Sequence, residues 1–474
     1  MGSYLNPGNF SFRGSLRSKI YVDKSELIEK TNEAFCTEQK YICVSRPRRF
    51  GKSMAANMLA AYYDRSENTE ELFRNLAICK ADSYKENLNQ YDVIKINMQE
   101  FLSMSETVEE MLEMLKNYLV LDFKETFQNV RFRDEKNLIQ VMKDVFSYTK
   151  CPFVILIDEW DCLFREYKQD KEAQKKYLDF LRAWLKDKDY VGLAYMTGIL
   201  PIKKYGSHSA LNMFTEYSMT NPREMAKYFG FTEDEVKKLL LAYHLESHLP
   251  EMKEWYDGYH FGDADIYCPW DVINHVELLC KDSKAEPKCY WINSSGNSLV
   301  KRFITRANKT TRDEIERLIA GEPIEKSVRL ELTYDEIDNS IDNIWSVLFT
   351  TGYLTQIGMT EQGAYKLVIP NKEVREVYKL QIQDWFDQKI ADNAEQMTSF
   401  WKDIEEGNTE AIEQYLNRTL NKTISVFDTK EPETEKENYY HTYIAGLLTG
   451  NTDWVVKSNV EAGEGFADII IEPQ

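Results

Sequence analysis

Residues 41–53 read Tyr41-Ile-Cys-Val-Ser-Arg-Pro-Arg-Arg-Phe-Gly-Lys-Ser53, an apolar run followed by a basic loop and a Gly-Lys-Ser triplet. This order predicts a strand, a tight turn, and a helix that the triplet opens and that continues over Met54–Tyr63. A helix N-terminus presents unpaired backbone N–H groups and a partial positive charge, which suit a polyphosphate. In such a loop Lys52 would reach the terminal phosphates and the Ser53 hydroxyl would ligate Mg²⁺. The stretch therefore predicts a phosphate-binding loop.

The loop departs from the Walker A pattern GxxxxGK(S/T) at its first position, where Arg46 replaces glycine. Arginine adopts a positive φ less easily than glycine, so we expect the loop to be built differently. Its guanidinium groups suit bidentate phosphate contacts and could equally pair with acidic neighbours. A basic strand-to-helix turn without a nucleotide is the alternative interpretation. The predicted nucleotide-binding residues are Arg46, Pro47, Arg48, Arg49, Phe50, Gly51, Lys52 and Ser53.

A second motif is the run Phe153-Val-Ile-Leu-Ile-Asp-Glu-Trp-Asp161, which is apolar and ends in acids. This pattern is typical of a parallel strand buried on both faces, and it has the form of a Walker B motif. Asp158 would hold Mg²⁺ together with Ser53, and Glu159 would polarise the attacking water. Asp161 has no assigned role. An acidic solvated loop after a core strand is the alternative, and the pairing with Lys52 argues against it because a doubly wound sheet brings such strand ends together.

Further strands and helices are predicted around these motifs. Residues Tyr190–Gly198 form a mostly apolar run in which Thr197 would sense the γ-phosphate or make a local turn hydrogen bond. Alternating strands and helices favour a parallel sheet covered on both faces. The other predicted strands are Tyr91–Met98 and Thr215–Met219, and the predicted helices are Thr107–Phe127, Leu138–Tyr148 and Gln174–Leu185.

These motifs together resemble the AAA-ATPase-like family of bacterial proteins, a group close to the archaeal and STAND-type ATPases. The resemblance rests on Ser45–Ser53, on Tyr21-Val-Asp-Lys-Ser25 and on the Leu-Ile-Asp-Glu-Trp-Asp segment, and it extends to Trp255–Gly262, Tyr267–Asp271 and Trp291–Gly296. It implies an ATPase that uses ATP and Mg²⁺, and a loop that tolerates a residue other than glycine at Arg46. It also implies a helical lid after the ATPase core.

Composition limits the class of protein. The length of 474 residues predicts several domains. The net charge of −19 does not favour a general nucleic-acid binder. The eight cysteines contain no CxxC pair, so we do not expect a disulfide framework or a zinc site. Free cysteines are consistent with the reducing cytoplasm, which is the predicted location. No segment is long and apolar enough to cross a membrane.

The region after Thr215 predicts helices at Glu224–Leu240 and Leu249–Trp255, with a cap at Thr232. The aromatic residues of Trp255–Trp270 could stack bases, but a packed turn is the favoured interpretation, and the lone His260 is expected to be structural. A winged-helix-like unit is predicted from a helix at Asp335–Leu348, strands at Tyr353–Ile357 and Tyr365–Ile369, and a helix at Glu373–Phe386; its sequence is not basic enough to favour DNA binding.

The C-terminal stretch resembles the opening of a PD-(D/E)XK nuclease domain, which accompanies the family named above. Residues Asp428–Lys436 read as a linker. The resemblance implies that Glu437 is the helix glutamate of that domain and that Asp468 is a metal ligand. The E-x-K strand that would complete the site is absent, so we expect a truncated or decayed nuclease without activity.

The sequence thus predicts an α/β fold, namely a P-loop NTPase with an AAA-like parallel sheet and helices on both faces. The predicted domains are 1–222 (ATPase), 223–330 (helical lid), 331–427 (winged-helix-like and helical) and 428–474 (linker and incomplete nuclease). The leading hypothesis is a cytoplasmic Mg²⁺-dependent ATPase driving a conformational or assembly switch, possibly as a homo-oligomer and in control of a nuclease. The alternatives are a nucleotide-binding scaffold with little turnover and, by family analogy alone, a nucleic-acid processing factor of mobile elements or phage defence.

Overall fold

The computed structural model describes residues 2–167, 169–199, 201–202, 211–291, 297–329, 340–391, 394–420, 444, 447–448, 451, 454–462 and 465–473. The chain divides into two compact units, of which the first contains Met1–Tyr290 and Ser327–Gln356, and the second contains Trp291–Lys326 and Ile357–Gln474. Each unit is described by itself.

A five-stranded parallel sheet forms the centre of the first unit, in the order β2-β3-β4-β1-β5. The three middle strands are buried along their whole length, as expected for strands with helices on both faces. Strand β4 lies between β1 and β3, so one strand separates the phosphate-loop strand from the acidic strand. The bounds are Tyr41–Ser45 (β1), Asp92–Asn97 (β2), Phe153–Asp158 (β3), Val191–Gly198 (β4) and Thr215–Tyr217 (β5).

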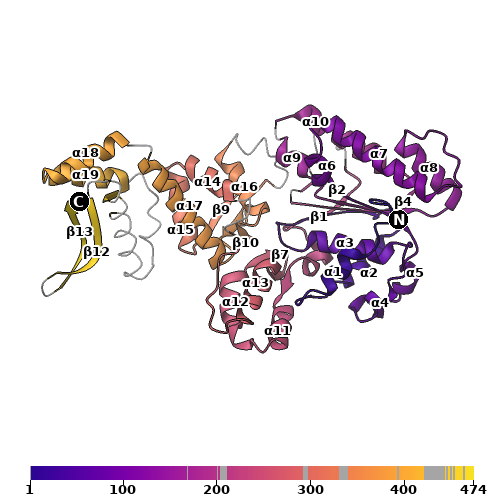
Figure 1. Ribbon diagram of the computed structural model, residues 1–474, viewed down its shortest axis with the longest axis horizontal. Coiled ribbons are helices and arrows are strands. Elements are labelled where there is room, and N and C mark those ends of the chain that lie inside the picture. The colour runs from indigo at the N-terminus through magenta and orange to yellow at the C-terminus, as the bar shows by residue number, and fades with distance from the viewer. Residues whose placement is uncertain are drawn as a thin grey trace. The chain divides into compact units, whose positions relative to one another are not determined.

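Helices cover both faces of this sheet (Figure 1). One face carries α1 (Phe10–Leu16), α2 (Glu26–Ala34), α3 (Lys52–Tyr63), α4 (Glu70–Phe73), the short 3₁₀ helix Ala77–Lys80 and α5 (Tyr84–Asn87). The other face carries α6 (Met98–Ser103), α7 (Val108–Thr126), α8 (Leu138–Thr149), α9 (Cys162–Glu166) and α10 (Lys171–Leu185). Helix α3 is largely buried and packs against β2, β3 and β4, which fixes the helix that follows the loop.

A small mixed subdomain follows β5 in the first unit. It contains a three-stranded antiparallel sheet in the order β6-β8-β7 and three α-helices. The bounds are Arg223–Tyr228 (3₁₀), Phe231–Thr232 (β6), Glu233–Ala242 (α11), Glu246–His248 (3₁₀), Leu249–Tyr256 (α12), Tyr259–Phe261 (β7), Ala264–Tyr267 (β8) and Pro269–Leu279 (α13). Helix α16 (Ile341–Thr350) also belongs to the first unit.

The second unit contains helices α14 (Asn297–Arg306), α15 (Lys309–Ile319), α17 (Lys372–Ala391), α18 (Ala394–Glu405) and α19 (Thr409–Leu420). A three-stranded sheet has the order β10-β11-β9, with bounds Thr355–Met359 (β10), Tyr365–Val368 (β11) and Ile324–Lys326 (β9). Strand β10 begins at the boundary between the units. An antiparallel pair, β12 (Trp454–Ala462) and β13 (Gly465–Pro473), follows near the C-terminus.

The predicted α/β fold is confirmed, and the strands and helices predicted before Gly198 agree with the structure to within a few residues. The cap at Thr232 is confirmed as a capping box with Glu235. The single helix predicted over Glu224–Leu240 is wrong, because a 3₁₀ helix, a turn at Gly230 with φ of 94° and strand β6 precede α11. The predicted helix Asp335–Leu348 overlaps α16, which begins at Ile341, and its residues 335–339 lie outside the described residues.

The division into four predicted domains stays a prediction. The predicted linker Asp428–Lys436 and Glu437 lie outside the described residues. In the part of the chain that the structure describes, no helix is long and apolar enough to cross a membrane.

Candidate functional site

The site lies at the carboxyl edge of the five-stranded sheet. Because β1, β2 and β3 are parallel, their carboxyl ends meet at one edge. The register pairs Asn97 at the end of β2 with Asp158 at the end of β3. The basic loop after Ser45 leaves β1 at the same edge and enters α3 at Lys52.

The loop reaches α3 through two residues with positive φ, Arg49 at 71° and Gly51 at 85°. Gly51 is the N-cap of α3, and no side chain caps this helix end. The first backbone N–H groups of a 12-residue helix are thus presented at the loop, as a phosphate site requires. Arg46 has no positive φ, so the missing first glycine is compensated by a left-handed turn placed three residues later.

Arg46 corrects a prediction, because its side chain turns away from the loop into the protein. It is fully buried and donates hydrogen bonds through Nη1 to the carbonyl oxygens of Tyr217 at 2.6 Å and Ser45 at 2.9 Å. Its guanidinium lies over the rings of Phe261 at 4.9 Å and Phe229 at 5.5 Å. Burial lowers its pKa to about 9, which leaves it charged at neutral pH. The group joins β1, β5 and the small subdomain and is not placed to bind phosphate.

The two other arginines of the loop lie at its surface. Arg48 is exposed and Arg49 is half-buried. Arg49 donates from Nη1 to the carbonyl oxygen of Tyr290 at 2.7 Å, and its guanidinium lies 4.9 Å from the centre of the Trp270 ring. Phe50 is buried against the rings of Tyr259 and Phe261.

Lys52 is held inside the loop. Its Nζ donates to the carbonyl oxygens of Pro47 at 2.8 Å and Arg46 at 3.0 Å. Burial lowers its pKa, while the nearby carboxylates of Glu159 and Asp158 act in the opposite direction. A buried ammonium group favours additional negative charge beside it. A polyphosphate at the α3 N-terminus would supply that charge.

Asp158 ends β3 in a buried position and accepts a hydrogen bond from the hydroxyl of Thr197 on β4. It also accepts from the backbone N–H of Glu159 at 3.0 Å. Thr197 is fully buried beside β1, where it pairs in register with Val44. The carboxylate of Asp158 is therefore oriented by the neighbouring strand.

Glu159 follows with φ of 54°, in the left-handed region that a non-glycine residue seldom adopts. Strain of this kind concentrates at functional sites. Its carboxylate forms an ion pair with Arg165 of α9, and Arg165 also donates from Nη2 to Oε1 of Gln99 at 3.2 Å. Asp161, buried and without an assigned role in the sequence, accepts from the backbone N–H of Ile199 at 3.0 Å and so fixes the end of β4.

A cavity of about 690 Å³ lies in front of these groups. Four of its side chains are cationic and two are carboxylates, so its lining favours an anion. The lining residues are Arg48, Arg49, Gly51, Lys52, Ser53, Met54, Asn97, Gln99, Glu159, Arg165, Glu166, Pro269, Trp270 and Ile273.

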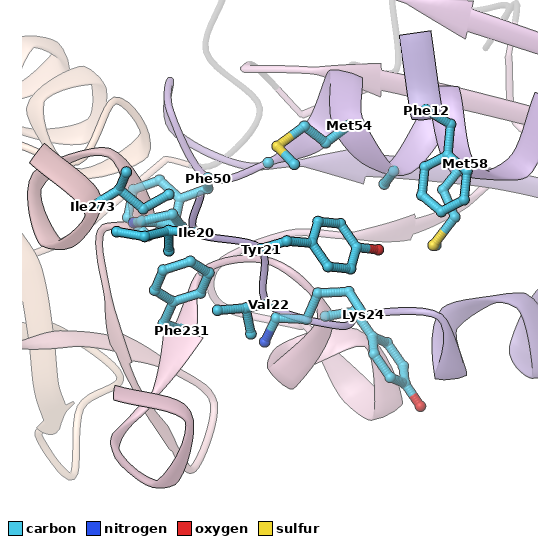
Figure 2. A pocket seen from close by; sticks show the side chains of 15 residues that line it. Phe12, Ile20, Tyr21, Val22, Lys24, Phe50, Met54, Met58, Phe231 and Ile273 are labelled. Atoms are coloured by element: carbon cyan, nitrogen blue, oxygen red, sulfur yellow. The ribbon is translucent and has the colours of Figure 1, made fainter. Parts of the chain in front are cut away.

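A second, smaller cavity of about 70 Å³ adjoins the loop and is mostly apolar. Ile20, Tyr21 and Val22 come to it from the segment between α1 and α2, and Phe50 and Met54 also line it (Figure 2). It shares Gly51, Met54, Pro269 and Ile273 with the larger cavity.

The structure brings most predicted site residues together. Lys52, Ser53, Glu159, Arg48, Arg49 and Gly51 line the larger cavity, Phe50 lines the smaller one, and Asp158 and Thr197 lie buried at the same sheet edge. Arg46 and Pro47 line neither cavity and contribute backbone carbonyls to Lys52. Asp468 lies exposed on β13 in the second unit, and Glu437 lies outside the described residues.

The cavity lining also includes polar and aromatic residues that are not among the predicted site residues, namely Asn97, Gln99, Arg165, Glu166 and Trp270. Asn97 lies at the end of the predicted strand Tyr91–Met98 and Gln99 directly follows that strand, and a polar residue at a strand end is a usable signal. The packed-turn interpretation is wrong for Trp270, which is 46% exposed and lines the cavity. Tyr256, Tyr259 and Phe261 are buried, as the packed-turn interpretation expects, and His260 pairs with Asp265.

The donor set fits a magnesium ion held mainly by a nucleotide. Among the described residues no three His, Cys, Asp or Glu side chains gather as a metal-binding group. Mg²⁺ at phosphate sites usually takes only one or two protein ligands besides phosphate oxygens and waters. The exposed Ser53 hydroxyl and the oriented Asp158 carboxylate provide such a pair.

The chain is similar to a protein of Azotobacter chroococcum mcd 1 described as "Uncharacterized protein in vnfD 5'region". The two are 24% identical over 372 residues, which cover 75% of this chain and 64% of that protein. This chain thus spans less than two thirds of that relative's length.

Three solved structures are similar at low scores. AMPPCP-bound DnaA from Aquifex aeolicus is 10% identical with a TM-score of 0.29, covering 65% of this chain and 81% of that one. The Aeropyrum pernix ORC1 protein in complex with DNA is 11% identical with a TM-score of 0.26, covering 77% and 95%. The Aeropyrum pernix ORC2 protein is 8% identical with a TM-score of 0.36, covering 79% and 98%. Residues 12–207, which contain β1 to β4 and the loop, match the family model described as "Predicted AAA-ATPase".

Proposed function

We propose that this chain binds ATP with Mg²⁺ at the carboxyl edge of the five-stranded sheet and hydrolyses it. One observation carries the proposal: Lys52 and Ser53 at the start of α3 line the same cationic cavity as Glu159, directly beside Asp158. The match of residues 12–207 to a family described as a predicted AAA-ATPase supports it. Phosphoryl transfer depends mainly on positioning and charge neutralisation, which these groups can provide.

Each of the four polar side chains at the sheet edge has its own role in binding ATP and Mg²⁺. Lys52 leaves the carbonyl oxygens of Arg46 and Pro47 and binds the terminal phosphates. Ser53 and Asp158 would hold Mg²⁺, which supplies charge neutralisation to the phosphates when bound. Thr197 keeps the Asp158 carboxylate oriented through its hydrogen bond, which adds a positioning role to the γ-phosphate sensing predicted for it.

Glu159 acts as the general base. Water attacks the γ-phosphorus, its proton passes to the Glu159 carboxylate, and the bond between the γ-phosphorus and the bridging oxygen breaks with its electron pair leaving on ADP. General-base catalysis of this kind contributes about 10²- to 10⁴-fold to a rate. Two observations support this role: Glu159 lines the cavity, and its backbone has a positive φ, a strained conformation of the kind that concentrates at functional sites.

The apolar cavity is the proposed position of the nucleotide base. Figure 2 shows Ile20, Val22 and Phe231 near one part of it and Phe50 beside them. Since Gly51 and Met54 border both cavities, a base in the smaller one is continuous with phosphates in the larger one. Flat apolar walls suit the faces of an aromatic base.

Phosphate release by the purified chain with ATP and MgCl₂ tests the proposal. Glu159→Gln is expected to lower the rate by about 10²- to 10⁴-fold while ADP affinity stays within threefold. Glu113→Gln, a matched change on the exposed face of α7, is the control and is expected to leave both quantities unchanged. Equal rates for Glu159→Gln and the unmodified chain would remove Glu159 as the base.

A nucleotide-binding scaffold with little turnover is the second candidate function. The ion pair between Glu159 and Arg165 favours it, because a carboxylate held by a guanidinium is not free to accept a proton. Thermal stabilisation by ATP without phosphate release would support this candidate. The cytoplasmic location, a homo-oligomer, a switch driven by hydrolysis, control of a nuclease and a role in nucleic-acid processing remain extensions of the proposal that rest on the sequence.

A further inference from the structure

Arg165 occupies a position between the proposed base and the phosphate cavity. It lies on α9, which begins three residues after Glu159, and its side chain is 9% exposed. Its guanidinium pairs with the carboxylate of Glu159, donates to Gln99 at 3.2 Å and lines the larger cavity. It is thus a nearly buried cation that touches the base and faces the space proposed for the phosphates.

The charge of the cavity favours an exchange of partners. Arg48, Arg49 and Lys52 already line this space, and Arg165 adds a fourth cation while Glu159 balances only part of the charge. Alongside the dominant effect of burial, the charge of Arg165 contributes to the lowered pKa of Lys52. A polyphosphate entering the cavity therefore competes with Glu159 for the Arg165 guanidinium, which binds carboxylate and phosphate in the same forked geometry.

Two arginines of the loop, Arg46 and Arg49, are less suited to this exchange. Arg46 is buried under Phe261 and Phe229, and Arg49 is directed to the Tyr290 carbonyl and the Trp270 ring. Both are held by these other partners, whereas Arg165 contacts Glu159 directly. Arg165 is therefore the residue through which a phosphate could change the state of the proposed base.

We propose that Arg165 is an intramolecular arginine that recognises the γ-phosphate of ATP and, in doing so, releases Glu159. This inference rests on the proposed ATPase function and deepens it. In the nucleotide-free protein Arg165 holds Glu159 as its counter-ion. When ATP is bound, Arg165 contacts the γ-phosphate oxygens, Glu159 becomes free to accept the proton of the attacking water, and Arg165 stabilises the negative charge on the phosphoryl group as ADP leaves.

ADP lacks the γ-phosphate and leaves the ion pair intact, so the two nucleotides should bind with different affinities. In calorimetric titrations of the full chain, a non-hydrolysable ATP analogue with Mg²⁺ is expected to bind more tightly than ADP. Arg165→Ala is expected to reduce this ratio of Kd values by about tenfold or more, the effect of one lost charged hydrogen bond. Phosphate release by the same variant should fall by about 10³-fold, as for other stabilising arginines.

Two further variants separate this role from a structural one. Arg165→Lys keeps the charge but loses the fork, so it should keep the fold and lose most of the discrimination. Glu159→Gln removes the competing carboxylate, so it should tighten binding of the ATP analogue relative to ADP, an effect that disappears in the double variant with Arg165→Ala. Arg182→Ala, on the exposed face of α10, is the matched control with unchanged ratio and rate.

The outcomes separate the inference from the function on which it rests. If neither ADP nor the analogue binds the unmodified chain, the proposed ATPase function fails, and the inference fails with it. If both nucleotides bind and are hydrolysed as expected, but Arg165→Ala and Arg165→Lys leave the Kd ratio unchanged, the ATPase stands and the role of Arg165 is refuted. A lower melting temperature of Arg165→Ala with an unchanged ratio would likewise assign Arg165 a purely structural role.

Discussion

Replacement of Arg46 by methionine should lower the free energy of unfolding and leave the affinity for nucleotide unchanged. The side chain is fully buried, with two hydrogen bonds to carbonyl oxygens and two aromatic rings around its guanidinium. A phosphate-binding arginine would give the opposite result, since its loss would weaken nucleotide binding and leave the fold intact.

The magnitude follows from these contacts. Arg46→Ala leaves the Tyr217 and Ser45 carbonyls without this donor and opens a cavity, so the free energy of unfolding should fall by about 3–5 kcal/mol. Methionine fills much of the space and packs well against the rings of Phe229 and Phe261. The remaining cost of Arg46→Met is that of the buried carbonyl groups, about 1–3 kcal/mol.

The assay is urea unfolding at pH 7.5, followed by circular dichroism, with ADP affinity measured on the same samples. Arg48→Met is the matched control, because Arg48 is exposed and lines the cavity. It should change the free energy of unfolding by less than about 0.5 kcal/mol and weaken ADP binding. Arg46→Met should show the reverse pattern, with Kd within threefold of the unmodified chain. A stable Arg46→Met variant that has lost nucleotide affinity would refute the assignment.

Three other predictions concern the site and its supports. Lys52→Ala should raise the Kd for ADP by about 10- to 100-fold in calorimetric titrations, because it removes a charged contact to phosphate, and an unchanged Kd would contradict the loop assignment. Gly198→Ala should lower the free energy of unfolding by about 1–3 kcal/mol in urea, since its Cβ would lie 2.6 Å from Nε1 of the buried Trp160; no loss would mean that the indole can move aside. Burial lowers the pKa of His275, whose Nε2 lies 2.7 Å from Glu251. Below about pH 6.5, the ordinary pKa of histidine, the unfolded chain therefore binds more protons than the folded chain, and the urea midpoint should fall as the pH decreases. His275→Gln should flatten this pH dependence, and an equally steep slope in the variant would assign the dependence to other groups.

Much of the core could be predicted because its signals are local. An apolar run such as Phe153–Asp158 predicts a buried strand of a parallel sheet without knowledge of its neighbours, and the Gly-Lys-Ser triplet marks the start of α3. The region after Thr215 was harder, because Gly230 and strand β6 interrupt what reads as one helical pattern.

The role of Arg46 could not be read from the sequence. Its acceptor Tyr217 lies 171 positions further along the chain, and its aromatic neighbours belong to the small subdomain. The same holds for Trp270, whose exposure depends on how α13 packs. Local patterns identify which residues are charged or aromatic, and only the fold decides which of them face the cavity.

The packing of Arg46 and Phe50 against the small subdomain has a mechanical consequence. Arg46 contacts Phe261, and Phe50 contacts both Phe261 and Tyr259, so two side chains of the loop pack against residues of strand β7. A glycine at position 46 would leave only one such anchor. A displacement of the loop would therefore act on the β6-β8-β7 sheet through direct side-chain contacts, and Arg46, the residue that departs from the motif, would provide one of those contacts.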